Sequence, residues 1–197
     1  MPTGLFGKFI MAQVFDRGNV FLNDLVYQLL SIQEDDHVLE IGFGTGKLIK
    51  RMAKQVNKGQ IEGVDFSNTM VSMASKKNKK DIANGTVKIH EGDFLEIPFE
   101  QKRFSKVCSV NTLYFWTDVE QTIRKIMAIL KPGGKFLLAF ENKEQLEKRK
   151  LSDRVFQLYS TDEIKEFLIR GGFSENVRIE SRKNRKSIFH CVVAEKI

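Results

Sequence analysis

The sequence predicts an α/β fold: a doubly wound, mostly parallel seven-stranded sheet with helices on both faces. Two observations predict it. From residue 37 onward, short apolar runs of strand type alternate with amphipathic runs of helix type, an alternation typical of parallel sheets with right-handed crossovers. The last two strand-like runs, about 175–181 and 187–195, flank the polar stretch "KNRK" and predict an antiparallel C-terminal hairpin strand at the edge of the sheet.

Residues 1–32 precede this alternation. Their apolar residues recur at near-helical spacing, so we expect two short helices joined by a turn near Gly18–Asn19. These helices would form an N-terminal helical cap, and residues 33–197 would form the core. No linker-like stretch divides the two parts, which predicts a single domain over residues 1–197.

Periodicity and cap signals place the other elements of the core. The remaining strands are expected at 37–41, 60–65, 86–91, 104–110 and 135–140. Helices are expected at 46–57, after Ser67 as the N-cap, at 118–130 and at 161–170. Gly59 should end the first of these helices, and capping boxes "TDVE" (117–120) and "STDE" (160–163) should open the last two. "KPGG" (131–134) should form a tight turn with Gly133 at positive φ.

The composition excludes several classes of protein. Of the 197 residues, 42% are hydrophobic and 29% are charged, which is ordinary for a soluble globular chain. No apolar run approaches the roughly 20 residues of a membrane span, and no secretion signal is visible. Cys108 and Cys191 lie in strand-like runs, so we expect buried thiols and a cytoplasmic location. Three scattered histidines (His37, His90 and His190) offer no zinc spacing, so we expect no metal site and structural roles for them.

The net charge of +7 raises the question of a nucleic-acid partner. The lysines and arginines are spread over helix faces and turns, as in "KKNKK" (76–80), "EKRK" (147–150) and "RKNRK" (182–186). This spread favours solvated faces over a phosphate-binding surface. Contact with RNA remains the alternative.

The ends of the first two expected strands carry residues that suit a nucleoside. Ligands of open α/β sheets bind beyond the carboxyl ends of the strands. In "GFGTG", Gly42 permits a tight turn, Gly44 lets a ligand approach the backbone, and Gly46 opens a helix with free N–H groups. Asp65 ends the second strand, 19 residues beyond Gly46 (65 − 46), where a carboxylate can accept both ribose hydroxyls.

The third and fourth expected strands end in residues that complete such a site. "EGDF" supplies Asp93 for an exocyclic amine and Phe94 for an aromatic base. "VNTLYFW" supplies the polar Asn111, followed by an aromatic trio near the reacting end of the ligand. Taken singly, such residues are more often turn caps or core. Their joint placement at one edge predicts a nucleoside site.

The glycine spacing distinguishes between two cofactors. Dinucleotide-binding loops use Gly-x-Gly-x-x-Gly, which would require a glycine at position 47. Lys47 stands there, and the third glycine is Gly46. An acidic residue, Glu40, precedes the first glycine by two positions. The spacing therefore disfavours an NAD-dependent oxidoreductase.

Five stretches together resemble a known family: "VLEIGFGTG", "GVDFSNTMV", "EGDFLEIPF", "VNTLYFW" and "LKPGGKFLLAF", within residues 37–140. The chain resembles the class I S-adenosylmethionine-dependent methyltransferases, type 11, a group that includes the quinone-biosynthesis methyltransferases. The resemblance implies a Rossmann-like fold and S-adenosyl-L-methionine as the cofactor. It implies that the glycine loop and Glu40 hold the methionine moiety, Asp65 the ribose, and Phe66 and Met70 one side of the adenine.

The cofactor-site residues implied by the resemblance are Glu40, Gly42, Phe43, Gly44, Thr45, Gly46, Asp65, Phe66, Met70, Gly92, Asp93, Phe94 and Asn111. The N-terminal segment is similar to the helical cap of related members, which lies over the substrate pocket; helices that merely cover the first helix layer are the alternative. The candidates for the acceptor pocket are Phe15, Asn19, Tyr114, Phe115 and Trp116.

Methyl transfer from a sulfonium is an in-line displacement, so alignment in a dry site can supply much of the rate. The sequence offers no clear general base; Tyr114 is the weak catalytic candidate, with Asp16 or Asp24 if the cap folds over the site. The Asn/Asp-Pro-Pro-aromatic sequence and a reactive cysteine are both missing. The leading hypothesis is therefore methyl transfer to a small, partly apolar acceptor. An RNA- or protein-directed methyltransferase and a non-catalytic binding module are the alternatives.

Overall fold

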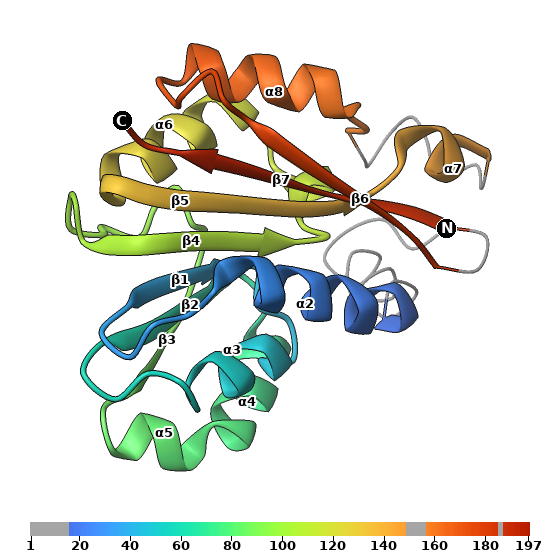
Figure 1. Cartoon of the computed structure of the whole chain (residues 1–197). Coiled ribbons are helices and arrows are strands. Elements are labelled where there is room, and N and C mark those ends of the chain that lie inside the picture. Colours follow the sequence, from blue (N-terminus) through green and yellow to red (C-terminus); the bar gives the residue numbers. More distant parts are fainter. Residues whose placement is uncertain (1–15, 149–156, 185–186) are drawn as a thin grey trace.

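The computed structural model describes residues 16–148, 157–184 and 187–197. Within them, one seven-stranded sheet has the order β3-β2-β1-β4-β5-β7-β6 (Figure 1). The strands are β1 (His37–Ile41), β2 (Gln60–Asp65), β3 (Val87–Glu91), β4 (Phe104–Val110), β5 (Leu130–Glu141), β6 (Arg178–Asn184) and β7 (Ser187–Glu195). β1 to β5 are parallel, and β7 runs antiparallel to both β5 and β6. The predicted sheet and its antiparallel hairpin strand are confirmed.

Helices cover both faces of this sheet (Figure 1). Among the described residues they are α2 (Asp16–Leu30), α3 (Lys47–Met52), α4 (Asn68–Lys77), α5 (Lys79–Ala83), the 3₁₀ turn η1 (Leu113–Phe115), α6 (Val119–Ile129), α7 (Lys143–Lys148) and α8 (Thr161–Arg170). One core cluster joins α2, α3 and α4 to the sheet through fully buried residues such as Leu22 and Ile49. The other joins α6 and α8 to the opposite face through Ile123 and Leu168.

The N-terminal prediction needs a correction. The turn expected near Gly18–Asn19 is wrong, because α2 runs without a break from Asp16 to Leu30. Gly18 lies within this helix, and the burial of Leu22, Leu25 and Val26 against the sheet outweighs the roughly 1 kcal/mol that a glycine costs in a helix. The first of the two expected helices, before Gly18, lies outside the described residues. α2 packs against β4, β5 and β7 and contacts α3.

The helix expected at 46–57 is also shorter than predicted. α3 ends at Met52, although Ala53 and Val56 are buried as their spacing indicated. The cause is a distant acceptor: the carbonyl of Glu34 receives the backbone N–H groups of residues 57, 58 and 59. This contact turns the chain out of the helix several residues before Gly59.

Three cap and turn signals have different outcomes. The capping box at Ser160 and Glu163 is confirmed at the start of α8. The box predicted at 117–120 is wrong by one residue, because Asp118 is the N-cap of α6 and accepts from the backbone of Gln121. "KPGG" lies within the irregular first part of β5, opposite the register shift between Phe104 and Lys106, and Gly133 has the predicted positive φ of 72°.

The remaining boundaries differ modestly. α4 and α5 divide at the buried Asn78, within the lysine run that we expected on one helix face. β6 begins three residues later than predicted. In the part of the chain that the structure describes, no helix is both long and apolar enough to cross a bilayer.

Candidate functional site

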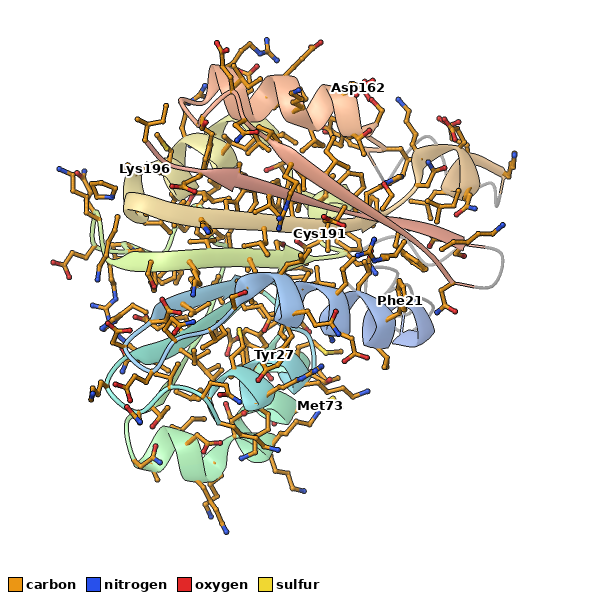
Figure 2. All side chains as sticks on the ribbon, in the orientation of Figure 1. Phe21, Tyr27, Met73, Asp162, Cys191 and Lys196 are labelled. Atoms are coloured by element: carbon orange, nitrogen blue, oxygen red, sulfur yellow. The ribbon has the colours of Figure 1, made fainter. Side chains whose placement is uncertain are left out.

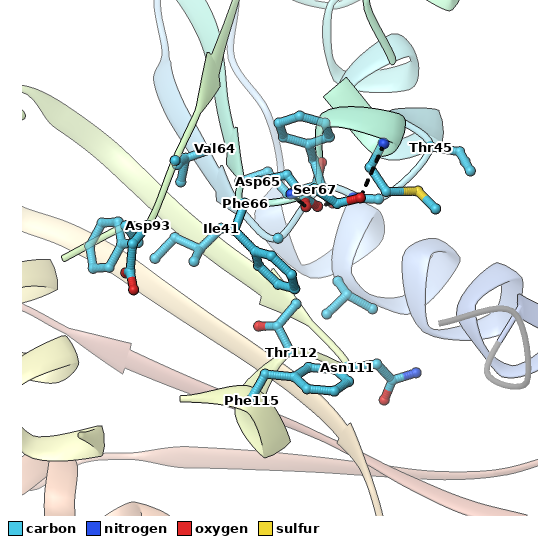
Figure 3. A pocket seen from close by; sticks show the side chains of 18 of the residues that line it. Ile41, Thr45, Val64, Asp65, Phe66, Ser67, Asp93, Asn111, Thr112 and Phe115 are labelled. Atoms are coloured by element: carbon cyan, nitrogen blue, oxygen red, sulfur yellow. Dashed lines mark hydrogen bonds between the residues drawn. The ribbon is translucent and has the colours of Figure 1, made fainter. Parts of the chain in front are cut away.

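A pocket of about 1190 Å³ lies at the carboxyl ends of the parallel strands. Figure 3 shows its walls: Asp65 and Phe66 on one side, Asn111 and Phe115 on another, and Asp93 on a third. These side chains come from the ends of three strands, β2, β3 and β4. The pocket thus lies where strand order reverses, with β1 and β4 at its centre.

The glycine loop after β1 is tied to the end of β2 by a carboxylate. The backbone N–H of Gly44 donates to Asp65 Oδ2 at 2.9 Å, and that of Ser67 donates to Asp65 Oδ1 at 3.0 Å. Asp65 is 7% exposed, and burial raises the pKa of its carboxyl while the two backbone donors lower it. Asp65 therefore shapes the loop, and each of its oxygens keeps lone-pair capacity for a ligand hydroxyl.

Two of the loop glycines serve different purposes. Gly42 has φ +72°, and a Cβ there would lie 2.3 Å from Cγ2 of Thr112, so this glycine permits close packing on the β4 loop. Gly44 has φ +53°, and a Cβ there would meet nothing within 4 Å. Because Gly44 lines the pocket, the open space beside it is the space that a ligand would occupy.

Glu40 is a buried acid at the wall of the pocket. It is 2% exposed and lines the pocket beside the glycine loop. Burial, and then the nearby Asp65 carboxylate, raise the pKa of Glu40 to about 8. Its Oε2 atom has no hydrogen-bond partner among the described residues. A buried carboxyl oxygen in this state can receive a cationic group of a ligand.

The loop after β3 forms the wall at Asp93. The Oδ1 atom of Asp93 accepts the backbone N–H of Leu95 at 2.8 Å, and Gly92 N–H donates to the carbonyl of Asp65 at 3.0 Å. Phe94 is 7% exposed and lines the pocket. The exposed ring of Phe66, the residue after β2, also lines it. Two aromatic residues therefore line the cavity beside the strand ends.

The loop after β4 holds Asn111 in a left-handed conformation. Asn111 has φ +55°, is 5% exposed, and donates its backbone N–H to the carbonyl of Ala139 at 2.8 Å. Asparagine tolerates this conformation better than most residues. Such strain at a strand end is common at functional sites.

The described residues bring most of the predicted site together. The predicted cofactor residues that line the pocket are Glu40, Gly42, Phe43, Gly44, Thr45, Asp65, Phe66, Met70, Gly92, Asp93, Phe94 and Asn111. Gly46 is not among the lining residues; its N–H closes the turn by donating to the carbonyl of Phe43. Of the acceptor-pocket candidates, Phe115 and Trp116 line the cavity.

The other candidates are placed differently. Tyr114 is not among the lining residues: it is 3% exposed, and its hydroxyl accepts the backbone N–H of Glu141 at 2.7 Å. This placement gives no support to Tyr114 as a catalytic residue. Asp24 forms an ion pair with Arg51, away from the lining residues. Phe15 lies outside the described residues, and Asn19 lies in the first turn of α2.

Sequence reasoning missed several lining residues. Val20 and Asn23 of α2 line the pocket, as do Met73 and Lys77 of α4 and Thr122 of α6. The spacing of some of these residues could have indicated that they lie together. Val20 and Asn23 are three residues apart, as are Met70 and Met73, so each pair shares a helix face. Nothing local indicated which face would meet the cavity.

Comparison with known proteins agrees with this geometry. Residues 38–134 match the family described as Methyltransferase domain. The protein of Bacillus subtilis (strain 168) named "Putative methyltransferase YrhH" is 31% identical over 140 residues, which cover 69% of this chain and 77% of that protein. The chain belongs to the class I S-adenosylmethionine-dependent methyltransferases.

Two further proteins are similar to this methyltransferase. A demethylmenaquinone methyltransferase of Lactobacillus johnsonii is 30% identical over 110 residues, which cover 55% of this chain and 45% of that protein. The crystal structure of a SAM-dependent methyltransferase from Aquifex aeolicus has a TM-score of 0.71 at 18% identity, covering 94% of this chain and 96% of the other. The second match supports the Rossmann-like fold.

The residues of the methyltransferase pocket fit its cofactor, S-adenosylmethionine. The unpartnered Oε2 of Glu40 matches a cationic amino group, and the open space at Gly44 admits a ligand against the backbone. The described ranges contain no group of three or more acidic, histidine or cysteine side chains arranged to hold a metal ion.

Proposed function

We propose that this methyltransferase transfers the methyl group of S-adenosylmethionine to a small, partly apolar acceptor. The observation that carries the proposal is the lining of one pocket. Residues suited to a nucleoside and apolar residues suited to an acceptor, such as Trp116 and Met73, share its walls. Its volume of about 1190 Å³ exceeds the roughly 300–1,000 Å³ typical of small-molecule pockets. Such a volume leaves room for an acceptor beside the cofactor.

In this proposal each wall holds one part of the cofactor. Glu40 and the glycine loop receive the methionine moiety, where the buried carboxyl faces a cationic amino group. Asp65 accepts the ribose hydroxyls with the lone pairs that Gly44 and Ser67 leave available. Phe66 and Phe94 border the adenine. The cofactor supplies an electrophilic methyl group on a sulfonium.

The acceptor would lie between the β4 loop, α2 and α4. The β4 loop contributes Phe115 and Trp116, α2 contributes Val20, and α4 contributes Met73. Val20 is 53% exposed and Met73 is 46% exposed, so both side chains are accessible to an acceptor in the pocket. This wall supports a role for α2 in the acceptor pocket as well as in covering the sheet.

The chain's own residues would act by position more than by proton transfer. Among the described residues that line the pocket there is no histidine. His90 bonds Glu62 at 2.7 Å, and His190 bonds Ser181 at 2.8 Å, as expected for structural residues. Alignment of acceptor and methyl group in a site screened from water can supply on the order of 7–11 kcal/mol. We therefore propose proximity catalysis without an obligatory acid–base pair.

Calorimetry tests the cofactor assignment. The unmutated chain should bind S-adenosylmethionine and S-adenosylhomocysteine and should not bind NAD. Asp65→Asn should weaken S-adenosylhomocysteine binding by about 1.5–3 kcal/mol, because a charged acceptor of hydrogen bonds is lost. Asp81→Asn is the matched control, since Asp81 pairs with Lys50 at 2.5 Å outside the lining residues. Unchanged affinity of Asp65→Asn would remove Asp65 from the site.

An acceptor screen tests the other half of the proposal. The purified chain would be incubated with labelled S-adenosylmethionine and, separately, demethylmenaquinone, a panel of small aromatic and aliphatic acceptors, total RNA, and total protein. Label in an organic-soluble small molecule is the expected outcome; the Lactobacillus johnsonii relative makes a demethylated quinone the first acceptor to try. RNA and protein are included because Lys47 and Lys77 also line the pocket and could contact a charged macromolecule. Label in RNA or protein would replace the proposal with a macromolecule-directed activity.

A further inference from the structure

The 92–99 loop after β3 has few backbone hydrogen bonds to the sheet. β3 is the edge strand of the sheet and pairs with β2 alone. Gly92 N–H donates to the carbonyl of Asp65, but the next bonds are local, from Glu96 and Ile97 to the carbonyl of Asp93. Phe99, at the end of the loop, packs on the rings of His90 and Phe104, with centroids 5.2 and 5.7 Å apart. The carbonyls before it need a further support to keep one orientation.

Lys125 of α6 supplies that support. Its Nζ donates to the carbonyls of Leu95 and Ile97, both at 2.7 Å. The same ammonium lies 5.1 Å from the ring centroid of Phe94 and 5.9 Å from that of Phe99. Two charge-assisted hydrogen bonds and two cation–π contacts therefore link one side chain to four residues of the loop.

Helix α6, which carries Lys125, packs against the sheet on both sides of this residue in the sequence. Lys125 is half-buried, and it lies between Ile123 and Ile126, which are both fully buried against the sheet. Burial lowers the pKa of Lys125, while Glu96 and Asp93 raise it. The ammonium is thus carried by a helix that packs against the sheet, and one of the two carbonyls that it bonds, that of Leu95, belongs to a residue that lines the pocket.

We propose that Lys125 is a positioning residue, which holds the 92–99 loop in the shape that receives the adenine of the cofactor. The inference rests on the proposed placement of the nucleoside between Phe66 and Phe94. Lys125 itself does not line the pocket, whereas Phe94 and Leu95, which it contacts, do. Its effect should fall on recognition of the base and spare the reacting end near Asn111.

A matched control is Lys196, which bonds the C-terminal end of the same helix. Lys196 Nζ also donates to two carbonyls, those of Met127 and Leu130, at 2.7 and 2.8 Å. It is also half-buried, and it lies outside the pocket lining. Figure 2 shows Lys196 on the opposite side of the molecule from Met73, a pocket residue. Lys196→Met therefore removes an equivalent pair of lysine–carbonyl hydrogen bonds at a position that does not line the pocket.

The experiment compares two ligands by calorimetry on the full chain. S-adenosylhomocysteine carries the exocyclic amine of adenine, and S-inosylhomocysteine has an oxygen in its place. Lys125→Met should weaken S-adenosylhomocysteine binding at least tenfold and S-inosylhomocysteine binding less than threefold, so the preference for adenine contracts. Lys196→Met should keep the preference of the unmutated chain. Turnover of Lys125→Met at saturating cofactor should stay within threefold, while its KM for S-adenosylmethionine rises at least tenfold.

An unchanged preference in Lys125→Met would overturn the inference. That outcome includes an equal loss of affinity for both ligands, with a fall in melting temperature like that of Lys196→Met. If Lys125→Met does not fold, Lys125→Gln decides the question, because its amide keeps one donor: a contracted preference supports the role and an unchanged preference refutes it. Failure of the unmutated chain to bind either ligand would overturn the proposed cofactor placement as well.

Discussion

Replacing Glu40 with glutamine should make the free protein more stable and its hold on the cofactor weaker. The pKa of Glu40 is about 8 in the folded chain, against an ordinary value of 4.5. At pH 7 the unfolded chain is therefore ionised at this position and the folded chain is mostly protonated. One pKa unit corresponds to 1.36 kcal/mol, so this carboxyl opposes folding by about 3 kcal/mol at pH 7.

The sign of the effect follows from the raised pKa. The fold favours the protonated acid, so Glu40 costs no stability below pH 4.5, where it is protonated in both the folded and the unfolded chain. The cost in free energy of unfolding grows as the pH rises from 4.5 and is complete once the pH has passed about 8. Glutamine does not ionise, so Glu40→Gln should gain about 3 kcal/mol at pH 7 and less than about 1 kcal/mol at pH 5. Urea denaturation at the two pH values measures the gain.

Binding should show the opposite effect. If the cationic amino group of the cofactor lies against Glu40, the carboxyl ionises in the complex and releases about 0.9 proton at pH 7. Affinity should then rise about tenfold from pH 6 to pH 7, a range in which an α-amino group stays protonated. Calorimetry of S-adenosylhomocysteine in buffers of different ionisation enthalpy measures the released protons. In Glu40→Gln the release should vanish, with binding about 10- to 100-fold weaker at pH 8.

Glu62 provides the control for this experiment. It is 1% exposed on the neighbouring strand β2, so burial raises its pKa, but hydrogen bonds and charges of His90 and Arg103 bring the net value below the ordinary one. Glu62→Gln should therefore lose stability at pH 7 and leave the proton release unchanged. An affinity that does not vary from pH 6 to pH 7, or no proton release by the unmutated chain, would refute the role given to Glu40.

Three further predictions concern the loops that follow β1 and β4. Gly44→Ala should fold, at a cost of about 1–2 kcal/mol from its positive φ, and should bind S-adenosylhomocysteine at least tenfold more weakly because its methyl group enters the open space; unchanged affinity would show that the ligand lies elsewhere. Gly42→Ala is the contrast: with Thr112 only 2.3 Å from the new Cβ, it should lose about 2–5 kcal/mol of stability in urea denaturation. Tyr114→Phe should cost about 1–3 kcal/mol of stability by removing the buried hydrogen bond that the N–H of Glu141 donates to the phenol oxygen, with turnover within tenfold of the parent; a thousandfold loss of turnover with cofactor affinity intact would assign the phenol to proton transfer.

Several elements could be predicted from the sequence because their signals are local. β2 (Gln60–Asp65), β4 (Phe104–Val110) and α8 (Thr161–Arg170) have the predicted boundaries. Strand patterns repeat every two residues, and the capping box of α8 spans only four residues, so neighbours in sequence suffice. The same holds for Asp65 and Asn111, since parallel strands place their carboxyl ends at one edge.

Elements that depend on distant partners could not be predicted. α3 ends at Met52 because the carbonyl of Glu34 collects three backbone N–H groups from the segment beyond it. The aromatic trio was predicted as one group, yet Tyr114 turns to Glu141 while Phe115 and Trp116 line the pocket. Residues only one position apart in the 3₁₀ turn η1 point in different directions, and the packing around it selects between them.

The sequence by itself determined the parallel sheet, the glycine loop and the series of polar residues at the strand ends, because each of these depends on residues that are close together in the sequence. Only the tertiary structure decided the state of Glu40, whose pKa depends on burial and on Asp65 in the next strand. It also decided the link from Lys125 to Leu95, which are 30 residues apart. Burial, and contact between distant residues, exist only when the chain has folded, so no local pattern carries them.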